Sequence, residues 1–149
     1  MLLARSYMTK RDPKIVSYTM SRIHSKDTSP ELIVRRIVYR LGYRYRLHMK
    51  DLPGKPDLVF LRKKKVIFVH GCFWHQHESP HCRNSRVPES NTDYWIPKFL
   101  RNVARDRLNQ TDLVNKGWEV LVVWECETKD NHVLEQRIRF FLGPTKRFP

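Results

Sequence analysis

PDLVFLRKKKVIFVHGCFWHQHESPHC, residues 56–82, is the stretch that decides the fold we expect for this chain. Two apolar runs of four residues flank the charged segment Arg62–Lys65, a pattern that predicts two antiparallel strands joined by a charged turn. If the two central lysines form the turn, Asp57 lies opposite His70; a slip of one residue places Asp57 opposite Val69 instead. Either register brings a carboxylate beside a segment rich in histidine and cysteine, which suggests a metal-dependent active site.

The composition limits the classes of protein to which the chain can belong. Its 149 residues suit one domain, large enough to bury about 70% of its unfolded surface. A net charge of +14, spread along the chain, favours a polyanionic partner such as nucleic acid over a merely solubilising surface. No segment approaches the ~18 consecutive apolar residues of a membrane span.

The cysteines and the N-terminus indicate a cytoplasmic protein. Met1–Ala4 is followed at once by Arg5, so we expect no export signal. Three cysteines are an odd number, which argues against a disulfide framework and favours reduced thiols.

The order of elements predicts an α/β fold with a mixed central sheet flanked by helices. We expect a basic N-terminal arm at 1–27, one domain at 28–143 and a short tail at 144–149. The domain should contain a helix, three strands, a long helix, a strand buried on both faces and a last helix. Outside the hairpin already described, their ranges are 28–41, 43–47, 92–116, 118–124 and 133–142.

Cysteines and histidines after the second hairpin strand have the spacing of a structural zinc site. Four residues separate Cys72 from His77, four more separate His77 from Cys82, and Cys126 follows a later strand. Three cysteines and one histidine are a standard composition for structural zinc. His81 is an alternative nitrogen ligand. The competing interpretation is three small buried thiols, because free cysteine packs well in cores.

A second group has the chemistry of phosphodiester hydrolysis. Asp57, at the start of a strand in a basic protein, is a candidate ligand for Mg²⁺, with a turn-capping role as the alternative. His70 and His75 are not needed for zinc, and imidazole can activate water, donate a proton to a leaving oxygen or stabilise a pentavalent phosphate. Glu31 is a weaker catalytic candidate, since a helix-capping role beside Thr28 explains it.

Two aromatic pairs, Phe73–Trp74 and Tyr94–Trp95, lie in expected loops or at element ends. Aromatic wedges can open a base step, and a mismatched step is less costly to open than a paired one. Packing within the protein is the alternative role for these rings.

Together these residues closely resemble the bacterial very short patch repair endonucleases, which nick DNA at T·G mismatches and belong to the restriction-endonuclease-like superfamily. The similarity runs from about Met20 through Glu127. Its markers are Met20–Ile23, Thr28–Glu31, Leu52–Asp57, Val66–His75 with its core HGCFWH, Asn102–Asp106, Gly117–Trp118 and Val123–Cys126.

The resemblance implies a role for each site residue. Asp57 and the backbone carbonyl of Val69 would hold Mg²⁺, and His70 and His75 would be the catalytic histidines. Glu31 would be an auxiliary acid that positions metal-bound water or His75. The structural zinc set would be Cys72, His77, Cys82 and Cys126. The intercalating side chains would be Phe73, Trp74 and Trp95, with Met20 as a minor-groove wedge from the opposite side.

The chain departs from the family pattern in three places. Val69 stands where some relatives have threonine, which leaves only a backbone carbonyl for metal binding. The loop Glu78–His81 is longer than in the most compact relatives and bears on the choice between His77 and His81. The superfamily's usual acidic-x-lysine partner of the aspartate is absent, so histidine chemistry must substitute for the lysine.

The leading hypothesis is a Mg²⁺-dependent endonuclease that nicks one strand of double-stranded DNA at a T·G mismatch. A zinc-stabilised DNA-binding module without catalysis is the first alternative, and a nuclease of the same fold with another DNA substrate is the second. We expect a monomer in the bacterial cytoplasm, associated with the nucleoid, with mismatch-repair proteins as candidate partners and no membrane contact.

Overall fold

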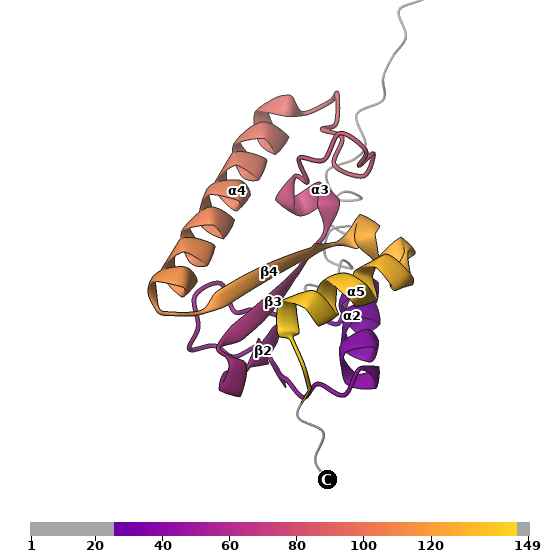
Figure 1. The fold of residues 1–149 in the computed structure, drawn as a ribbon. Helices are drawn as coiled ribbons and strands as arrows, with labels where there is room; N and C mark the ends of the chain where they lie inside the picture. The colour runs from indigo at the N-terminus through magenta and orange to yellow at the C-terminus, as the bar shows by residue number, and fades with distance from the viewer. Residues whose placement is uncertain (1–25, 146–149) are drawn as a thin grey trace, which may run out of the picture.

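A four-stranded mixed sheet forms the centre of the protein, of which the computed structural model describes residues 26–145 (Figure 1). The strands lie in the order β1–β2–β3–β4; β2 is antiparallel to β1 and β3, and β4 is parallel to β3. Met20 and most of the expected N-terminal arm lie outside the described residues. The strands are β1 (Arg46–Leu47), β2 (Leu58–Phe60), β3 (Lys65–His70) and β4 (Glu119–Trp124).

Helices cover both faces of this sheet. Figure 1 shows α4 along one face and α2 with α5 on the other. A parallel pair of strands needs a long connection, and α4 supplies it between β3 and β4. The helices are α2 (Ser29–Arg40), α3 (Cys72–His75), α4 (Thr92–Asn115) and α5 (Asn131–Leu142), with short 3₁₀ turns η1 (Leu61–Lys63) and η2 (Glu125–Lys129). The expected mixed sheet flanked by helices is confirmed.

Alternating side chains along the strands separate two apolar cores. Ile67 and Val69 of β3 point to the α2 and α5 side, whereas Val66 and Phe68 point to the α4 side. Strand β4 alternates in the same way. Because the period of a strand is two residues, His70 continues the row that faces α4. This places His70 beneath the long helix.

The first helix begins as the sequence predicts. The Thr28 side chain caps α2 by accepting a hydrogen bond from the Glu31 backbone N–H at 3.4 Å, and Pro30 lies in the first turn. The Glu31 carboxylate reaches one residue beyond the cap, where it accepts a hydrogen bond from the Asp27 backbone N–H at 3.0 Å. Glu31 therefore stabilises the entry to the helix while its carboxylate stays at the end of α2 that faces the sheet.

The register predicted for the hairpin is wrong. Leu58 pairs with Ile67, and continuing that register places Asp57 across from Phe68, not from His70 or Val69. The turn is longer than the two lysines expected, because it contains η1 followed by Lys64 in a left-handed conformation with φ of 54°. The antiparallel pairing itself is confirmed.

Three smaller expectations also need correction. The strand expected at 43–47 is reduced to the two residues of β1. Strand β4 is not buried on both faces, since Leu121 and Val123 are buried whereas Val120 and Val122 are only partly covered on the α4 side. The loop expected after His70 begins with the short helix α3.

No helix within residues 26–145 combines the length and apolar character needed to cross a membrane.

Gly54 packs the loop before β2 tightly against α4. Its φ is 72°, and a Cβ at this position would lie 2.9 Å from Asn109 Cβ. Gly117, after α4, has φ of 87° but open space around it. Substitutions at the two glycines can therefore be compared: at Gly117 a side chain adds only backbone strain, whereas at Gly54 it adds a steric clash as well.

We expect Gly54→Ala to lower the free energy of unfolding by about 2–3 kcal/mol, because it adds a steric clash to the strain of a left-handed residue. Gly117→Ala should cost only about 1 kcal/mol, from strain alone. Urea unfolding of the two variants measures the difference. Equal losses would contradict the close approach of Gly54 to α4.

Candidate active site and cysteine cluster

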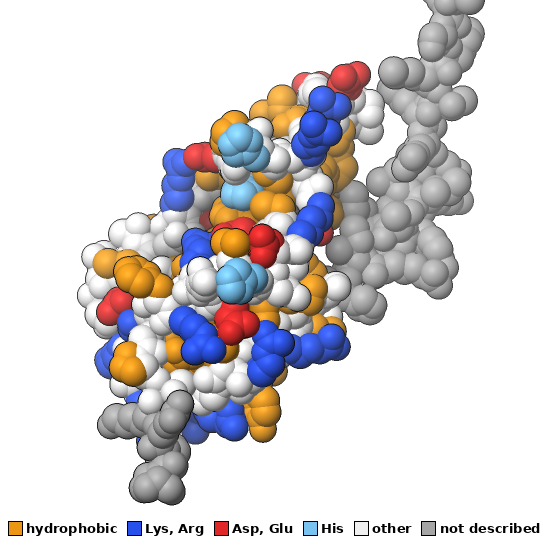
Figure 2. Space-filling model, turned by 45° about the vertical axis from the view of Figure 1, so that its right-hand side comes forward, with side chains coloured by type: hydrophobic (Ala, Val, Ile, Leu, Met, Phe, Trp, Pro, Cys, Tyr) orange, Lys and Arg blue, Asp and Glu red, His pale blue; other side chains and the backbone are white. Residues whose placement is uncertain are grey.

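A cleft of about 720 Å³ opens between the ends of β3 and α2 on one side and α4 on the other. Its lining includes Asp57, His70, His75 and Glu31, all expected from the sequence as catalytic candidates. Figure 2 shows one face of the domain, on which histidine and acidic side chains lie among Lys and Arg side chains. The structure therefore brings the four candidates into one site.

Asp57 is a largely buried carboxylate held against β3. Its Oδ2 accepts a hydrogen bond from the Val69 backbone N–H at 2.6 Å. Burial raises the pKa of Asp57 to about 7, with a further upward contribution from Glu31, whereas the Val69 N–H and the Arg35 guanidinium act in the opposite direction. A carboxylate that is hard to ionise in a protein cleft is well placed to receive a cation.

His70 and His75 form a stacked pair in the same cleft. Their ring centroids are 3.9 Å apart and their planes differ by 7°. Burial lowers the pKa of His70 to about 4, with a further downward contribution from His75, so the His70 imidazole is neutral near pH 7. His75 Nδ1 lies 2.6 Å from Asp106 Oδ2, a carboxylate supplied by α4. Asp106 thus fixes the orientation of the His75 ring.

Sequence reasoning did not assign a role to Asp106, although this residue lies within the marker Asn102–Asp106. Helical spacing offered a signal, because Asp106 and Asn109 are three residues apart on α4 and both line the cleft. The sequence alone, however, does not show that the helix face with Asp106 and Asn109 points into the cleft.

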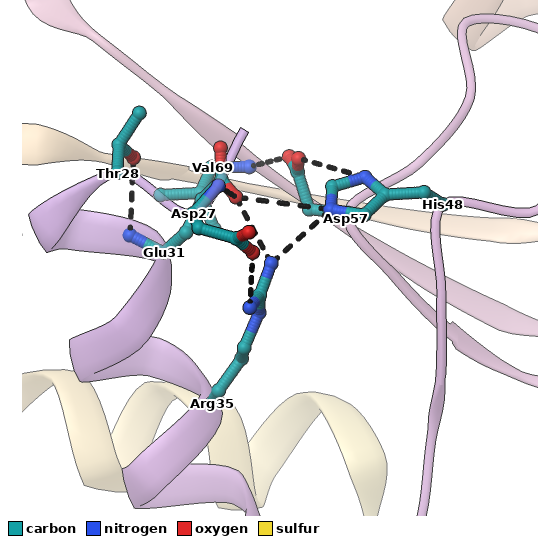
Figure 3. Close-up of polar contacts among 7 residues, drawn as sticks. All are labelled: Asp27, Thr28, Glu31, Arg35, His48, Asp57 and Val69. Atoms are coloured by element: carbon teal, nitrogen blue, oxygen red, sulfur yellow. Dashed lines mark hydrogen bonds and ion pairs between the residues drawn. The ribbon is translucent and has the colours of Figure 1, made fainter. Parts of the chain in front are cut away.

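Glu31 is buried and belongs to a hydrogen-bonded network at the end of α2 (Figure 3), whose other carboxylate, Asp27, is exposed. Its Oε2 accepts a hydrogen bond from Arg35 Nη2 at 3.1 Å, while Arg35 Nη1 donates to Asp27 Oδ1 at 2.7 Å. This hydrogen bond lowers the pKa of Asp27. The carboxylate that contacts His75 in the described part of the chain is Asp106, whereas Glu31 contacts Arg35.

His48, which the sequence did not single out, completes this network. Its Nε2 lies 3.1 Å from Arg35 Nη2, and its Nδ1 lies 3.9 Å from Asp57 Oδ1. Figure 3 shows the ring between the Asp57 carboxylate and the Arg35 guanidinium. The loop after β1 carries His48, and no periodic pattern there marks the residue.

The three cysteines converge with His77 beside this cleft. The ligand atoms of Cys72, His77, Cys82 and Cys126 all lie within 4.8 Å of one another. His77 Nδ1 is 3.8 Å from Cys72 Sγ and 3.3 Å from Cys126 Sγ. His81 is not part of this group. Burial is the main reason why the pKa of Cys72 is raised to about 12.

A row of rings joins the cysteine cluster to the histidine pair. His77 stacks on Trp124 with centroids 4.3 Å apart, and the Trp124 edge lies against His70 at 5.3 Å. Because β3 and β4 are in parallel register, Trp124 is the direct partner of His70. The position of His77 is therefore connected to that of His70 through one side chain.

The aromatic residues cluster beside the cleft. Phe73 packs edge-on to Trp74 at 5.0 Å and to Trp95 at 5.3 Å. Lys98 Nζ lies over the rings of Trp74 at 5.2 Å and Trp95 at 5.8 Å. The rings are partly buried against one another, yet Tyr94 is 53% exposed. They form a rim that combines aromatic surface with positive charge.

A basic α/β domain with a buried carboxylate, an imidazole pair and a cysteine cluster has the components of a nuclease that could hold metal. The model of the family described as "DNA mismatch endonuclease Vsr" matches residues 8–82. The type II nicking enzyme V.XorIIP of Xanthomonas oryzae pv. oryzae is 48% identical over 139 residues, which cover 93% of this chain and 100% of the relative. The DNA mismatch endonuclease Vsr of Escherichia coli is 39% identical over 118 residues, or 79% of this chain and 74% of the relative.

The chain therefore belongs to the Vsr family, and the family resemblance expected from the sequence is confirmed. It is a DNA endonuclease, a hydrolase. The hypothesis of a DNA-binding module without catalysis loses its support.

The burial of the Asp57 carboxylate predicts how the stability of the protein depends on pH. A pKa raised from 3.8 to about 7 means that the folded protein disfavours the charged form. The contribution of Asp57 to the free energy of unfolding is therefore complete below the pKa of the unfolded state. It decreases as the pH rises towards 7. Without added divalent cation, Asp57→Asn should raise the free energy of unfolding at about pH 8 by on the order of 2 kcal/mol, or roughly 5 °C in Tm.

Thermal unfolding measures this gain, which should narrow as pH is lowered to about 5. Asn keeps an acceptor for the Val69 N–H, so the hydrogen bond is retained. The exposed Asp51→Asn is the matched control and should leave Tm unchanged. A less stable Asp57→Asn protein at about pH 8 would show that burial does not penalise this charge.

Proposed function

We propose that the protein is a Mg²⁺-dependent endonuclease that nicks one strand of duplex DNA at a T·G mismatch, and that its domain is of the restriction-endonuclease-like type. The observation that carries this proposal is the buried Asp57 carboxylate in the cleft of the His70–His75 pair. The names of the relatives support it, since one is a DNA mismatch endonuclease and another a nicking enzyme.

The residues of the cleft fit a divalent cation. Asp57 Oδ2 is occupied by the Val69 N–H, which leaves Oδ1 as the oxygen available for a metal, together with the Val69 backbone carbonyl. Asp27 and Glu31 both pair with the guanidinium of Arg35, whereas Asp57 has no Lys or Arg ion-pair partner among the described residues. Mg²⁺ prefers oxygen ligands and retains several waters. When bound, it would supply Lewis-acid stabilisation of the phosphate charge.

The histidine pair would perform the proton transfers. The contact of Nδ1 with Asp106 orients His75 and leaves Nε2 as the ring atom that can exchange a proton with water or with the leaving oxygen. His70, kept neutral by burial, can donate one hydrogen bond to a phosphate oxygen without adding charge. The pair thus supplies the proton chemistry that a lysine supplies elsewhere in the superfamily.

The aromatic rim would recognise the mismatch. Phe73, Trp74 and Trp95 already pack as one cluster, so their conformational entropy is largely lost before DNA binds. Lys98 over these rings adds a charge that suits the phosphate backbone. A weakly paired T·G step is the least costly place for such rings to enter the base stack.

The cysteine cluster would hold structural zinc. Ligand atoms at the vertices of a zinc tetrahedron lie roughly 3.3–3.8 Å apart, given bond lengths near 2.0–2.3 Å. The two distances from His77 Nδ1 to sulfur, 3.3 and 3.8 Å, match this geometry. Zinc would tie α3 to the end of β4 and so hold His75 and Trp74 in place.

Nicking of a duplex with one T·G pair tests the proposed activity. With Mg²⁺, wild type should cut one strand, and a fully paired duplex and other mismatches should react more slowly. Asp57→Asn should reduce the rate by at least about 10³-fold, the loss of several kcal/mol of charge stabilisation. His75→Ala should reduce it by about 10²–10⁴-fold.

Matched controls are Asp51→Asn and His132→Ala, which change the same residue types at exposed positions. Both should retain wild-type rates. Robust nicking by Asp57→Asn would eliminate the metal role of that carboxylate. If the protein prefers another lesion or an intact sequence, it is still a nuclease, but the proposed T·G substrate is wrong.

Zinc analysis tests the cysteine cluster. Protein purified without a histidine tag should contain about one zinc atom per chain. His77→Ala should lose most of this zinc and unfold at a lower temperature, whereas His81→Ala should keep it. Fully folded wild-type protein without zinc, or zinc loss from His81→Ala alone, would contradict the assignment.

A further inference from the structure

His48 occupies a position in the cleft that the proposed chemistry does not yet use. Its ring lies between two carboxylates, with Nδ1 3.9 Å from Asp57 Oδ1 and Nε2 3.9 Å from Glu31 Oε2 (Figure 3). Its side chain is 21% exposed, so it is largely enclosed. A histidine in this place can influence the carboxylate proposed to hold the metal.

Arg35 determines which nitrogen of His48 carries the proton. Arg35 Nη2 lies 3.1 Å from His48 Nε2, and a guanidinium can only donate hydrogen bonds. His48 Nε2 must therefore be the unprotonated acceptor, which leaves the proton on Nδ1. This is the nitrogen that faces Asp57 Oδ1. The network thus favours the ring tautomer whose N–H is directed at the Asp57 carboxylate.

Arg35 is itself held rigidly enough to impose this choice. Its side chain is only 11% exposed, and its two terminal nitrogens are engaged by Asp27 and Glu31. Its Nε is buried and has no hydrogen-bond partner among residues 26–145.

We propose that His48, fixed by Arg35 as the Nδ1–H tautomer, is a positioning residue that orients the Asp57 carboxylate for metal binding. The proposal deepens the proposed function and rests on Asp57 as the Mg²⁺ ligand. The Val69 N–H holds Oδ2, and the His48 N–H faces Oδ1. At 3.9 Å the His48 N–H forms no hydrogen bond that would occupy Oδ1, but its dipole favours one orientation of the carboxylate plane, which is the usual task of groups behind a metal ligand.

Nitrogen NMR of the histidine rings tests the tautomer without any metal or DNA. At a pH where the ring is neutral, the His48 signals, assigned by their loss in His48→Asn, should show a protonated Nδ1 and an unprotonated Nε2. In Arg35→Met, which removes the donor to Nε2, the ring should lose this preference. A wild-type ring protonated at Nε2 would overturn the proposal.

Metal binding tests the consequence. The readouts are the rise in Tm that Mg²⁺ produces and the Mg²⁺ concentration for half-maximal nicking. His48→Gln, whose amide mimics Nε2, should weaken the metal response about tenfold or more. His48→Asn, whose amide N–H takes the place of Nδ1–H, should recover most of it. His132→Asn, at an exposed position on α5, should behave as wild type.

The outcomes separate this inference from the proposed function. If wild type nicks the T·G duplex with Mg²⁺ but His48→Gln and His48→Asn respond to Mg²⁺ alike, the positioning role is wrong while the function stands. If wild type does not nick, the function fails, and the NMR result still decides the tautomer. If a variant unfolds, the wild-type ring measurement still decides the tautomer, with the His48 signals assigned through the backbone resonances instead.

Discussion

The parallel pairing of β3 with β4 is the constraint on which the rest of the site depends. Six residue pairs in register bring His70 level with Trp124 and end both strands at one edge of the sheet. The chain therefore leaves β3 into α3 and leaves β4 into η2 at the same place, so that Cys126 meets Cys72 and His77. Without this register, neither the cysteine cluster nor the row of rings behind the histidine pair could form.

Basic and acidic residues are balanced in the lining of the cleft, whereas the whole chain is strongly basic. The protein carries +14 overall, yet Asp27, Glu31 and Asp57 gather around one buried arginine. A basic surface attracts DNA through counterion release, but an ionised carboxylate such as Asp57 repels a phosphate that approaches it closely. Under the proposed function, a divalent cation between the carboxylate and the phosphate oxygens would offset this repulsion.

The sequence identified residues whose type reveals their chemistry and missed those whose role depends on packing. Spacing in the sequence was informative where site residues stand in one dense segment or follow a recognisable strand, as do Asp57, His70 and the cysteine set. Asp106 and His48 come from a long helix and from an irregular loop, and only the tertiary fold places them. The hairpin register failed for a local reason, because the left-handed Lys64 and the 3₁₀ turn before it lengthen a turn whose sequence shows no glycine.

The location of a divalent cation in a complex with a T·G duplex tests the central claim most directly. In crystals with Mn²⁺ in place of Mg²⁺, the anomalous signal of manganese reports the site without reference to activity. We expect manganese at the Asp57 carboxylate, beside the scissile phosphate and apart from the cysteine cluster. Manganese bound by His70, His75 and Asp106 or by Asp27, Glu31 and His48, with none at Asp57, would contradict it.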